Sequence, residues 1–308
     1  MANVVLITAP VHPFLPAYLT EKGFEVRYAP KAQWEDLVHT LDKVVGLILT
    51  TRLVLSADRM ALFPQLKWIG RLGSGMELID QVAATTRGIV CESSPEGNAP
   101  AVGEQALGML LSLLHKIHSS QAEVRQGLWI RDANRGTELG GKTLGIIGYG
   151  HTGQAFAKVL QGFGVKILAH DKYKTGFSSE QIQESSLAEI KQSADVISFH
   201  LPLSAETHHY ASASFFAGLA KSPYLINTSR GSVVDSAALL LALQNGQLQG
   251  AALDVLEKEP LTENKGSEKE TVDSLLALPQ VLVTPHIAGY SHEAFERMAR
   301  VLVKKLGI

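Results

Sequence analysis

The sequence Gly-Tyr-Gly-His-Thr-Gly that begins at Gly148 has the residue types and the spacing that bind a pyrophosphate. In this pattern Gly148 supplies a tight turn, Gly150 lets the backbone approach a phosphate, and Gly153 lets the next helix pack on the preceding strand. At the start of that helix, where His151 and Thr152 lie, free N–H groups donate hydrogen bonds to phosphate oxygens. These five residues are therefore predicted to bind a dinucleotide.

An acidic residue follows this turn at the distance that a dinucleotide site requires. Asp171 comes just after a strand predicted at residues 165–169, where its carboxylate can accept hydrogen bonds from both ribose hydroxyls of NAD. The same charge would repel the 2′-phosphate of NADP. Lys172 and Lys174 stand beside it and partly offset that charge, so the strictness of the preference stays open. NAD is the expected cofactor.

The elements around the turn support this interpretation over an ordinary glycine turn. Residues 143–147 form a short apolar run, typical of a strand buried on both faces of a parallel sheet. Strand, glycine-rich turn, helix, second strand and terminal acid then follow in order. That order is far more specific than the glycines alone.

Length, composition and charge limit the classes of protein to consider. The chain has 308 residues, 45% of them hydrophobic, and a formal net charge of −2, which suits two domains with separate cores. Neither a nucleic acid nor a membrane surface is expected as the main partner, because the charge is near neutral. No apolar run reaches the roughly 18 residues of a membrane span. The first residues lack the basic region of a signal peptide, so a cytoplasmic location is expected.

Cysteine and histidine residues give no sign of a metal site. Cys91 is the single cysteine, which rules out an internal disulfide or a cysteine metal cluster, and we interpret it as a buried or partly buried hydrophobe. The histidines show no metal-ligand spacing, and His151, His170, His208 and His209 are expected at the surface or at the rim of the cofactor site. No metal is predicted.

The first hundred residues alternate between strand-like and helix-like segments, which predicts a parallel α/β sheet. After the fourth strand, Gly73-Ser74-Gly75 offers bare N–H groups that suit an anion, although an ordinary turn explains the same residues. Helices are predicted at residues 55–62 and 78–86. Strands are predicted at residues 4–8, 24–28, 44–50, 67–71 and 88–91.

The middle of the chain is predicted to connect two domains. Residues 93–98 are polar and turn-rich, so we interpret them as a hinge, and residues 102–119 have the periodicity of a long helix. Residues 127–140 are predicted to be irregular, with Trp129 as a packing or interface anchor.

Polar residues follow four further strands, predicted at 195–200, 224–228, 249–253 and 281–284. Ligands of open α/β sheets bind outside the carboxyl ends of the strands, so these residues are expected to meet at the cofactor. Asp235 is predicted to cap a helix over residues 236–244. The polar strand ends are His200, Ser229 with Arg230, Asp254 and His286.

Three ordered segments resemble the signatures of the D-isomer-specific 2-hydroxyacid dehydrogenases, in their short phosphoglycerate dehydrogenase-like form. They are Asn-Thr-Ser-Arg-Gly from Asn227, Asp-Val-Leu-Glu-Lys-Glu-Pro from Asp254, and Thr-Pro-His-Ile-Ala-Gly from Thr284. Segments 70–75, 97–105, 142–153 and 200–203 are similar to the family too, so the resemblance covers nearly the whole chain.

The resemblance implies an α/β fold of two doubly wound parallel-sheet domains. A Rossmann nucleotide-binding domain, residues 98–287, is then inserted into a flavodoxin-like substrate domain made of residues 1–97 and 288–308. A C-terminal helix near residues 291–305 returns to the first domain.

The chemistry of the signature residues agrees with this family. Reduction of a 2-oxo acid requires a cation for the carboxylate, and Arg230 offers a planar fork for bidentate binding. His286 can protonate the new alkoxide, since a neighbouring carboxylate stabilises a charged imidazole and fixes its tautomer. By resemblance that carboxylate is Glu259. By resemblance also, Asp254 accepts a hydrogen bond from the nicotinamide carboxamide and orients the ring.

The family pattern also marks the remaining site residues. Besides the turn, Asp171 and Asp254, the cofactor site is predicted to include His200, Pro202, Thr228 and Gly289. The substrate site is predicted to include Arg52, Arg71, Ser74, Gly75, Asn98, Arg230 and His286.

The substrate is the least determined feature. Arg52, similar in position to an arginine of phosphoglycerate dehydrogenases, and Arg71, beside the Gly-Ser-Gly segment, would suit a phosphate. They therefore favour 3-phosphoglycerate and 3-phosphohydroxypyruvate, with glyoxylate or hydroxypyruvate reduction as the alternative. An NADH-binding corepressor of the same fold is an alternative of another class.

Two further expectations concern the surface. The resemblance implies a homodimer formed through the nucleotide-binding domains, with the long helix and the Trp129 region at the contact. The polar stretch of residues 261–273 is predicted to be a mobile, solvated loop, which would restrict the substrate if it folded over the cleft.

Overall fold

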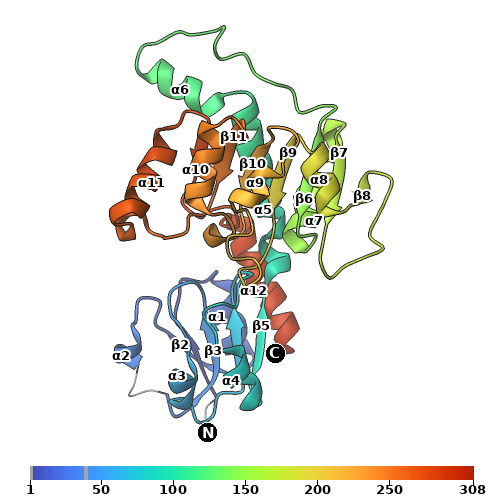
Figure 1. Cartoon of the computed structure of the whole chain (residues 1–308). Coiled ribbons are helices and arrows are strands. Elements are labelled where there is room, and N and C mark those ends of the chain that lie inside the picture. The colour runs from blue at the N-terminus through green and yellow to red at the C-terminus, as the bar shows by residue number, and fades with distance from the viewer. Residues whose placement is uncertain (1–2, 38–40) are drawn as a thin grey trace. The chain divides into compact units, whose positions relative to one another are not determined.

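The computed structural model describes residues 3–37 and 41–308 and divides the chain into two compact units. Unit 1 consists of Met1–Ala99 and Gly289–Ile308, and unit 2 consists of Pro100–Ala288. Each unit has its own parallel sheet with helices on both faces, as Figure 1 shows. Residues 1–2, with which the predicted first domain begins, lie outside the described residues.

Unit 1 has a five-stranded sheet whose order, β2-β1-β3-β4-β5, is that of flavodoxin-like folds. All neighbouring strands are parallel, which confirms the predicted sheet. The strands are β1 (Val4–Ile7), β2 (Glu25–Tyr28), β3 (Val44–Leu49), β4 (Trp68–Arg71) and β5 (Val90–Ser93). The helices are α1 (Phe14–Glu21), α2 (Trp34–Leu37), α3 (Ala57–Ala61), α4 (Gln81–Thr86) and α12 (His292–Leu306).

Two hydrophobic layers hold the sheet of unit 1. Helices α2, α3 and α4 pack on one face around Phe63, which is fully buried. Helices α1 and α12 cover the other face, where Leu302 of α12 is fully buried. Ser291 begins α12 by accepting a hydrogen bond from the N–H of Ala294.

Unit 2 has a seven-stranded parallel sheet in the order β12-β11-β10-β9-β6-β7-β8. The strands predicted around the glycine-rich turn and the four with polar ends are all present. The edge strand β8 was not predicted, since only Ile182 of its three residues is buried. The strands are β6 (Thr143–Ile147), β7 (Lys166–His170), β8 (Ile182–Glu184), β9 (Val196–Phe199), β10 (Tyr224–Asn227), β11 (Gly250–Leu253) and β12 (Val281–Val283).

Helices cover both faces of this sheet. Helices α5 (Pro95–Leu114) and α7 (His151–Leu160) pack on one face, and α6 (Ile117–Arg125) follows α5. The other face is covered by α8 (Leu187–Ser193), α9 (Ala213–Ala217), α10 (Ser236–Gln244) and α11 (Gly266–Ala277). Asp235 caps α10, as predicted, by accepting hydrogen bonds from the N–H groups of Ala237 and Ala238.

The turn-rich conformation predicted for the hinge at residues 93–98 is wrong, although the boundary between the two units, after Ala99, directly follows it. Ser93 ends β5 and α5 already begins at Pro95, because proline has the right φ for a first helical position and its missing N–H costs nothing there. The predicted helix at 102–119 also differs, since α5 ends at Leu114. Lys116, with a left-handed φ of 53°, separates it from α6.

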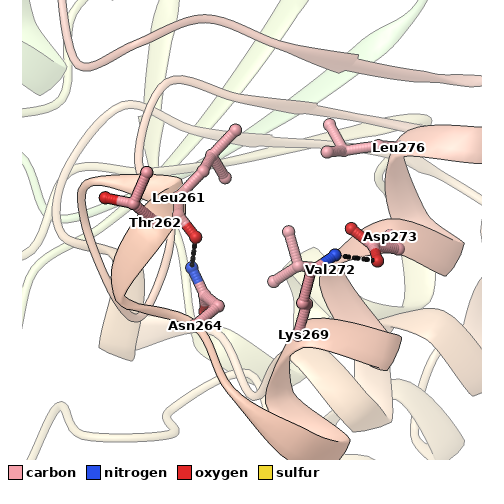
Figure 2. A pocket seen from close by; sticks show the side chains of 7 residues that line it. All are labelled: Leu261, Thr262, Asn264, Lys269, Val272, Asp273 and Leu276. Carbon is pink, nitrogen blue, oxygen red and sulfur yellow. Dashed lines mark hydrogen bonds and ion pairs between the residues drawn. The ribbon is translucent and has the colours of Figure 1, made fainter.

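The prediction of a mobile loop at residues 261–273 is wrong as well. Helix α11 starts at Gly266 because Val272 and Leu275 are spaced to be buried together against the core of unit 2. Beside it, a cavity of about 260 Å³ is lined in part by Leu261, Val272 and Leu276, and an ion pair between Lys269 and Asp273 lies at its edge (Figure 2).

The described residues contain no candidate membrane-spanning helix. None of their helices combines the length and the apolar character that crossing a bilayer requires.

Candidate active site

The predicted cofactor residues of unit 2 lie where the strand order of its sheet reverses. From β6 the chain adds β7 and β8 on one side, and β9 to β12 on the other. Loops after β6 and β9 therefore diverge at this point, which is where open α/β sheets bind ligands. The glycine-rich turn follows β6, Asp171 follows β7, and His200 follows β9.

The glycine-rich turn has the close contacts that its three glycines permit. Gly148 has a φ of 94°, and a Cβ there would lie 2.4 Å from the carbonyl oxygen of His200. A Cβ on Gly153 would lie 2.1 Å from the carbonyl oxygen of Gly148, so α7 packs tightly under the turn. Gly150 instead faces open space, which is what the approach of a phosphate needs. His151 and Thr152 open α7 directly after it.

Asp171 is fixed against this turn by backbone N–H groups. Its Oδ2 accepts a hydrogen bond of 2.8 Å from the N–H of Tyr149, within the turn. Its Oδ1 accepts bonds of 2.9 Å and 3.1 Å from the N–H groups of Tyr173 and Lys174. The carboxylate is thus held beside the turn, as a ribose partner must be.

Two polar atoms near the turn are buried without a hydrogen-bond partner among the described residues. They are Nδ1 of His200 and Oγ1 of Thr228. Phe199 and Asn227 are register partners on β9 and β10, so His200 and Thr228 follow neighbouring strands side by side. Buried polar groups normally have partners, and these two atoms therefore fit a bound ligand.

His200 is a neutral residue in this environment. Burial lowers its pKa from 6.5 to about 3, and its Nε2 lies 2.8 Å from Oγ of Ser198. The ring also lies against Phe156 of α7, with 5.5 Å between centroids. Pro202 is exposed in the turn that follows, where its carbonyl accepts a hydrogen bond from Thr207.

Asn227, which was not predicted as a site residue, shapes the turn that carries Arg230. Its side chain is fully buried, and its Nδ2 donates a 3.0 Å hydrogen bond to the carbonyl oxygen of Arg230. Its Oδ1 accepts from both the N–H and the hydroxyl of Ser229. Gly231 lets this turn lie against the next one, since a Cβ there would be 1.9 Å from the carbonyl oxygen of Leu256. The polar residues of the Asn-Thr-Ser-Arg-Gly segment were the sequence signal that could have identified Asn227.

His286 and Glu259 form a hydrogen bond of 2.7 Å between Nδ1 and Oε2. Glu259 is oriented by a second bond, which its Oε1 accepts from the N–H of Leu256. Burial alone would raise the pKa of Glu259. The hydrogen bonds from His286 and Leu256, with the nearby charges of His286 and Arg230, outweigh burial and lower this pKa. The carboxylate therefore stays charged at neutral pH.

Asp254 holds the loop that presents His286. It is buried, and its Oδ1 accepts hydrogen bonds from Oγ1 of Thr284 at 2.5 Å and from the N–H of Ile287 at 2.9 Å. Its Oδ2 accepts a bond of 2.8 Å from the N–H of Ala288. His286 has a φ of 56°, which a non-glycine residue adopts only when its surroundings impose it. The contacts of Asp254 impose it here, in addition to any role toward a nicotinamide.

Arg230, Glu259 and His286 line one cavity of about 180 Å³ within unit 2. The cavity also includes Glu257, which sequence reasoning missed. Its Oε2 lies 2.7 Å from Nε2 of His209, so that histidine is paired inside the unit. The remaining lining residues are Leu203, Gly231, Ser232 and Leu256.

The predicted residues of unit 1 meet around the loop after β4. Oγ of Ser74 donates a hydrogen bond of 3.1 Å to Oδ1 of Asn98, and Gly75 follows in the same half-buried loop. Gly289 packs against Asn98, since a Cβ there would lie 2.6 Å from Nδ2. The structure thus places Gly289, predicted for the cofactor, beside residues predicted for the substrate.

The two predicted phosphate-binding arginines contact backbone carbonyls. Nη2 of Arg52 donates hydrogen bonds to the carbonyl oxygens of Thr8, Pro30 and Ala32, at 2.9, 3.3 and 2.6 Å. Arg71 is 7% exposed, and its Nη1 contacts the carbonyl oxygen of Leu72. Both side chains thus contact loops of unit 1, and a phosphate-binding role for them stays a prediction.

A sequence model described as "D-isomer specific 2-hydroxyacid dehydrogenase, NAD binding domain" matches residues 107–288. The D-3-phosphoglycerate dehydrogenase of Methanocaldococcus jannaschii is 32% identical over 305 residues, which are 98% of this chain and 56% of that protein. The chain thus spans about half the length of the curated relatives that it matches.

Two solved structures share the fold. The D-lactate dehydrogenase of Aquifex aeolicus, complexed with NAD and lactic acid, has a TM-score of 0.84 and 29% identity, covering 99% of this chain and 94% of that one. The NADPH-dependent glyoxylate/hydroxypyruvate reductase of Sinorhizobium meliloti, with NADP and malonate, has a TM-score of 0.84 and 30% identity, covering 100% and 93%. By the family match over residues 107–288, the chain belongs to the D-isomer specific 2-hydroxyacid dehydrogenases, whose NAD binding domain it contains.

Proposed function

We propose that this protein is an NAD-dependent oxidoreductase that interconverts a small D-2-hydroxy acid and its 2-oxo acid. The observation that carries the proposal is the shared cavity of Arg230, Glu259 and His286, with the hydrogen bond between the last two. A cation, a carboxylate and an imidazole are the groups that this reaction needs near its reacting atoms.

Each of the three residues has a definite task in the proposed reaction. Arg230 binds the substrate carboxylate through its guanidinium fork. Nδ1 of His286 contacts Glu259, so Nε2 is the nitrogen that faces a substrate and gives its proton to the C2 oxygen. Glu259, held charged, stabilises the protonated imidazole before that transfer. The hydride that reduces C2 comes from the bound nicotinamide cofactor.

NAD is proposed as the cofactor because the residues of unit 2 fit it. Gly150 faces open space, Asp171 lies beside the turn, and the atoms left without partners at His200 and Thr228 suit a polar ligand. The Aquifex structure holds NAD, whereas the Sinorhizobium enzyme is NADPH-dependent, so the family fold accepts either cofactor. Asp171 decides between them in this chain.

Two substrates are proposed, each with its own support. The curated relatives are named D-3-phosphoglycerate dehydrogenases, which favours 3-phosphoglycerate and 3-phosphohydroxypyruvate. A structural relative at 30% identity is named a glyoxylate/hydroxypyruvate reductase, which favours an unphosphorylated acid. The substrate roles of Ser74, Gly75 and Asn98 stay predictions.

The test is NADH oxidation by the purified protein with 3-phosphohydroxypyruvate, hydroxypyruvate, glyoxylate and pyruvate. We expect turnover with at least one acid. The variants Arg71→Ala and Arg52→Ala, assayed with the phosphorylated and the unphosphorylated acids, distinguish the two proposed substrates. A selective loss of 3-phosphohydroxypyruvate reduction supports the phosphorylated substrate, and equal effects support the other. NADH binding without turnover of any acid would contradict the enzyme and favour a corepressor-like binding protein.

We also propose that the protein forms a homodimer and that it acts in the cytoplasm. Figure 1 shows α6 and the long segment that joins it to β6 along one edge of unit 2. This region exposes apolar side chains, which suit a partner surface. Light scattering should give the mass of a dimer, and Trp129→Asp should shift it toward the monomer. The exposed residues are Ile117, Val124, Leu128, Trp129 and Ile130.

A further inference from the structure

A small polar cluster joins the segment after β7 to the segment after β9. Nζ of Lys172 forms an ion pair of 2.5 Å with Oε2 of Glu206. The hydroxyl of Tyr173 donates a hydrogen bond of 3.2 Å to the same oxygen. Glu206 itself lies in the turn that follows Pro202, where Oγ1 of Thr207 accepts a bond from the N–H of Ser204.

The position of this cluster relates it to the cofactor site. Strand β6 lies between β7 and β9, so a contact between their following segments passes by the carboxyl end of β6, where the glycine-rich turn begins. Tyr149 ties the same segment to the turn, through its N–H to Asp171 and its carbonyl to Nζ of Lys174 at 3.3 Å. The cluster therefore adjoins the predicted ribose partner, Asp171.

The charges of the cluster bear on the choice between NAD and NADP. Lys172 is the residue next to Asp171. Without an anionic partner, its ammonium group would attract the 2′-phosphate of NADP. Glu206 neutralises it. The hydrogen bond from Lys172 lowers the pKa of Glu206, and the hydrogen bond to Glu206 raises the pKa of Lys172. Both groups are thus charged and paired at neutral pH.

We propose that Glu206 is a specificity-determining residue for the cofactor: by pairing with Lys172 it withholds that cation from a 2′-phosphate and so favours NAD(H) over NADP(H). The inference rests on the proposed function, because it assumes that a dinucleotide binds at the glycine-rich turn. It adds a second carboxylate, from a different segment of the chain, to the selection made by Asp171.

The test compares the dissociation constants of NADH and NADPH, measured by fluorescence titration at low ionic strength. Glu206→Gln keeps the size of the side chain and removes its charge. We expect NADPH to bind about three- to fivefold more tightly and NADH to change less than about twofold, as suits an exposed charge. The gain should shrink at high salt, where exposed charges are screened.

Three further variants separate this effect from a general change in the fold. Glu206→Asp keeps the charge and should retain the wild-type preference. Glu268→Gln, on α11, breaks another exposed ion pair, with Lys258, and should change neither constant. In a Lys172→Met background, Glu206→Gln should no longer favour NADPH, because the cation that it would release is gone.

The outcomes distinguish this inference from the proposed function. If the wild type binds NADH but Glu206→Gln leaves the ratio of the two constants unchanged, the role of Glu206 is refuted and the enzyme proposal stands. If Glu206→Gln still increases NADPH binding in the Lys172→Met background, the role of Glu206 is also refuted, and the enzyme proposal again stands. If the wild type binds neither dinucleotide, the proposed function fails together with the inference.

Discussion

Two histidines at the carboxyl end of the same sheet have opposite environments. His200, after β9, is 7% exposed, contacts Ser198 and Phe156, and has a pKa that burial lowers to about 3. The side chain of His286, after β12, is 44% exposed and hydrogen-bonded to the carboxylate of Glu259. The first ring is neutral near pH 7, so it does not supply a proton as an imidazolium would. The second has the partner that a proton donor needs.

The contrast shows that position at a strand end does not assign a role to a histidine. Burial without a charged partner disfavours the imidazolium, whereas a carboxylate at hydrogen-bonding distance stabilises it. The environment of each ring depends on residues distant in the sequence: Glu259 for His286, and Phe156 for His200. The following predictions test this difference, beginning with the largest effect.

Loss of the imidazole at position 286 should have the largest effect. His286→Gln removes the proposed proton donor, and we expect kcat/KM for 2-oxo acid reduction to fall about 10³-fold, within the range for general acid catalysis. His208→Gln is the control, since that exposed histidine stacks on His209 and should leave the rate unchanged. A His286→Gln enzyme with nearly full activity would remove the distinction between the two rings.

Loss of the support under His286 should come next. Asp254→Asn replaces one carboxylate oxygen by an NH₂ group, which cannot accept the hydrogen bond that Ile287 or Ala288 now donates, so we expect kcat/KM to fall about 10- to 100-fold and stability to fall by about 1–3 kcal/mol. The measurement combines steady-state kinetics with thermal unfolding. Unchanged stability with lower activity would mean that Asp254 acts on the nicotinamide and not on the loop.

The buried ring should make stability depend on pH. Between pH 3 and 6.5 the unfolded state binds the proton of His200 and the folded state does not, so stability is lost as pH falls through this window, by about 1.4 kcal/mol per unit. His200→Gln should flatten this slope in denaturant unfolding measured from pH 7 to pH 4. An identical slope in wild type and variant would show that His200 is protonated in the folded state.

The smallest of these effects is the change in folding stability expected from loss of the Glu259 charge. Its pKa is lowered in the folded state, so its charge stabilises the fold above its unfolded pKa near 4.5, and this contribution is lost as pH falls through the lower folded value. Glu259→Gln should therefore be slightly less stable than wild type at pH 7, and the difference should vanish toward pH 3. A constant difference across that range would mean that the carboxylate is not coupled to His286.

The local part of the site could be predicted from residue spacing, whereas the long-range pair of His286 and Glu259 was predicted only through the family resemblance. The glycines of the turn and Asp171 lie within one strand-helix-strand unit, so spacing alone indicates their contacts. The burial of His200, by contrast, depends on α7, and the clamp from Asp254 on the loop of His286 crosses about 30 residues. Only packing in three dimensions shows these contacts.

The failed predictions have the same cause. Residues 261–273 look like a solvated loop by composition, and α11 forms because Val272 and Leu275 pack against a core that the local sequence does not contain. Arg52 and Arg71 contact backbone carbonyl oxygens that the sequence does not reveal, and their role toward a substrate stays a prediction.

Transfer of deuterium from the cofactor is the most direct test of the proposed reaction. The protein is incubated with NADH carrying deuterium at the transferable C4 position and with each 2-oxo acid, and the product is analysed by mass spectrometry and chiral chromatography. We predict a D-2-hydroxy acid with one deuterium at C2 from wild type, and a yield about 10³-fold lower from His286→Gln at equal times. A product without deuterium, or none from any acid, would contradict hydride transfer at this site.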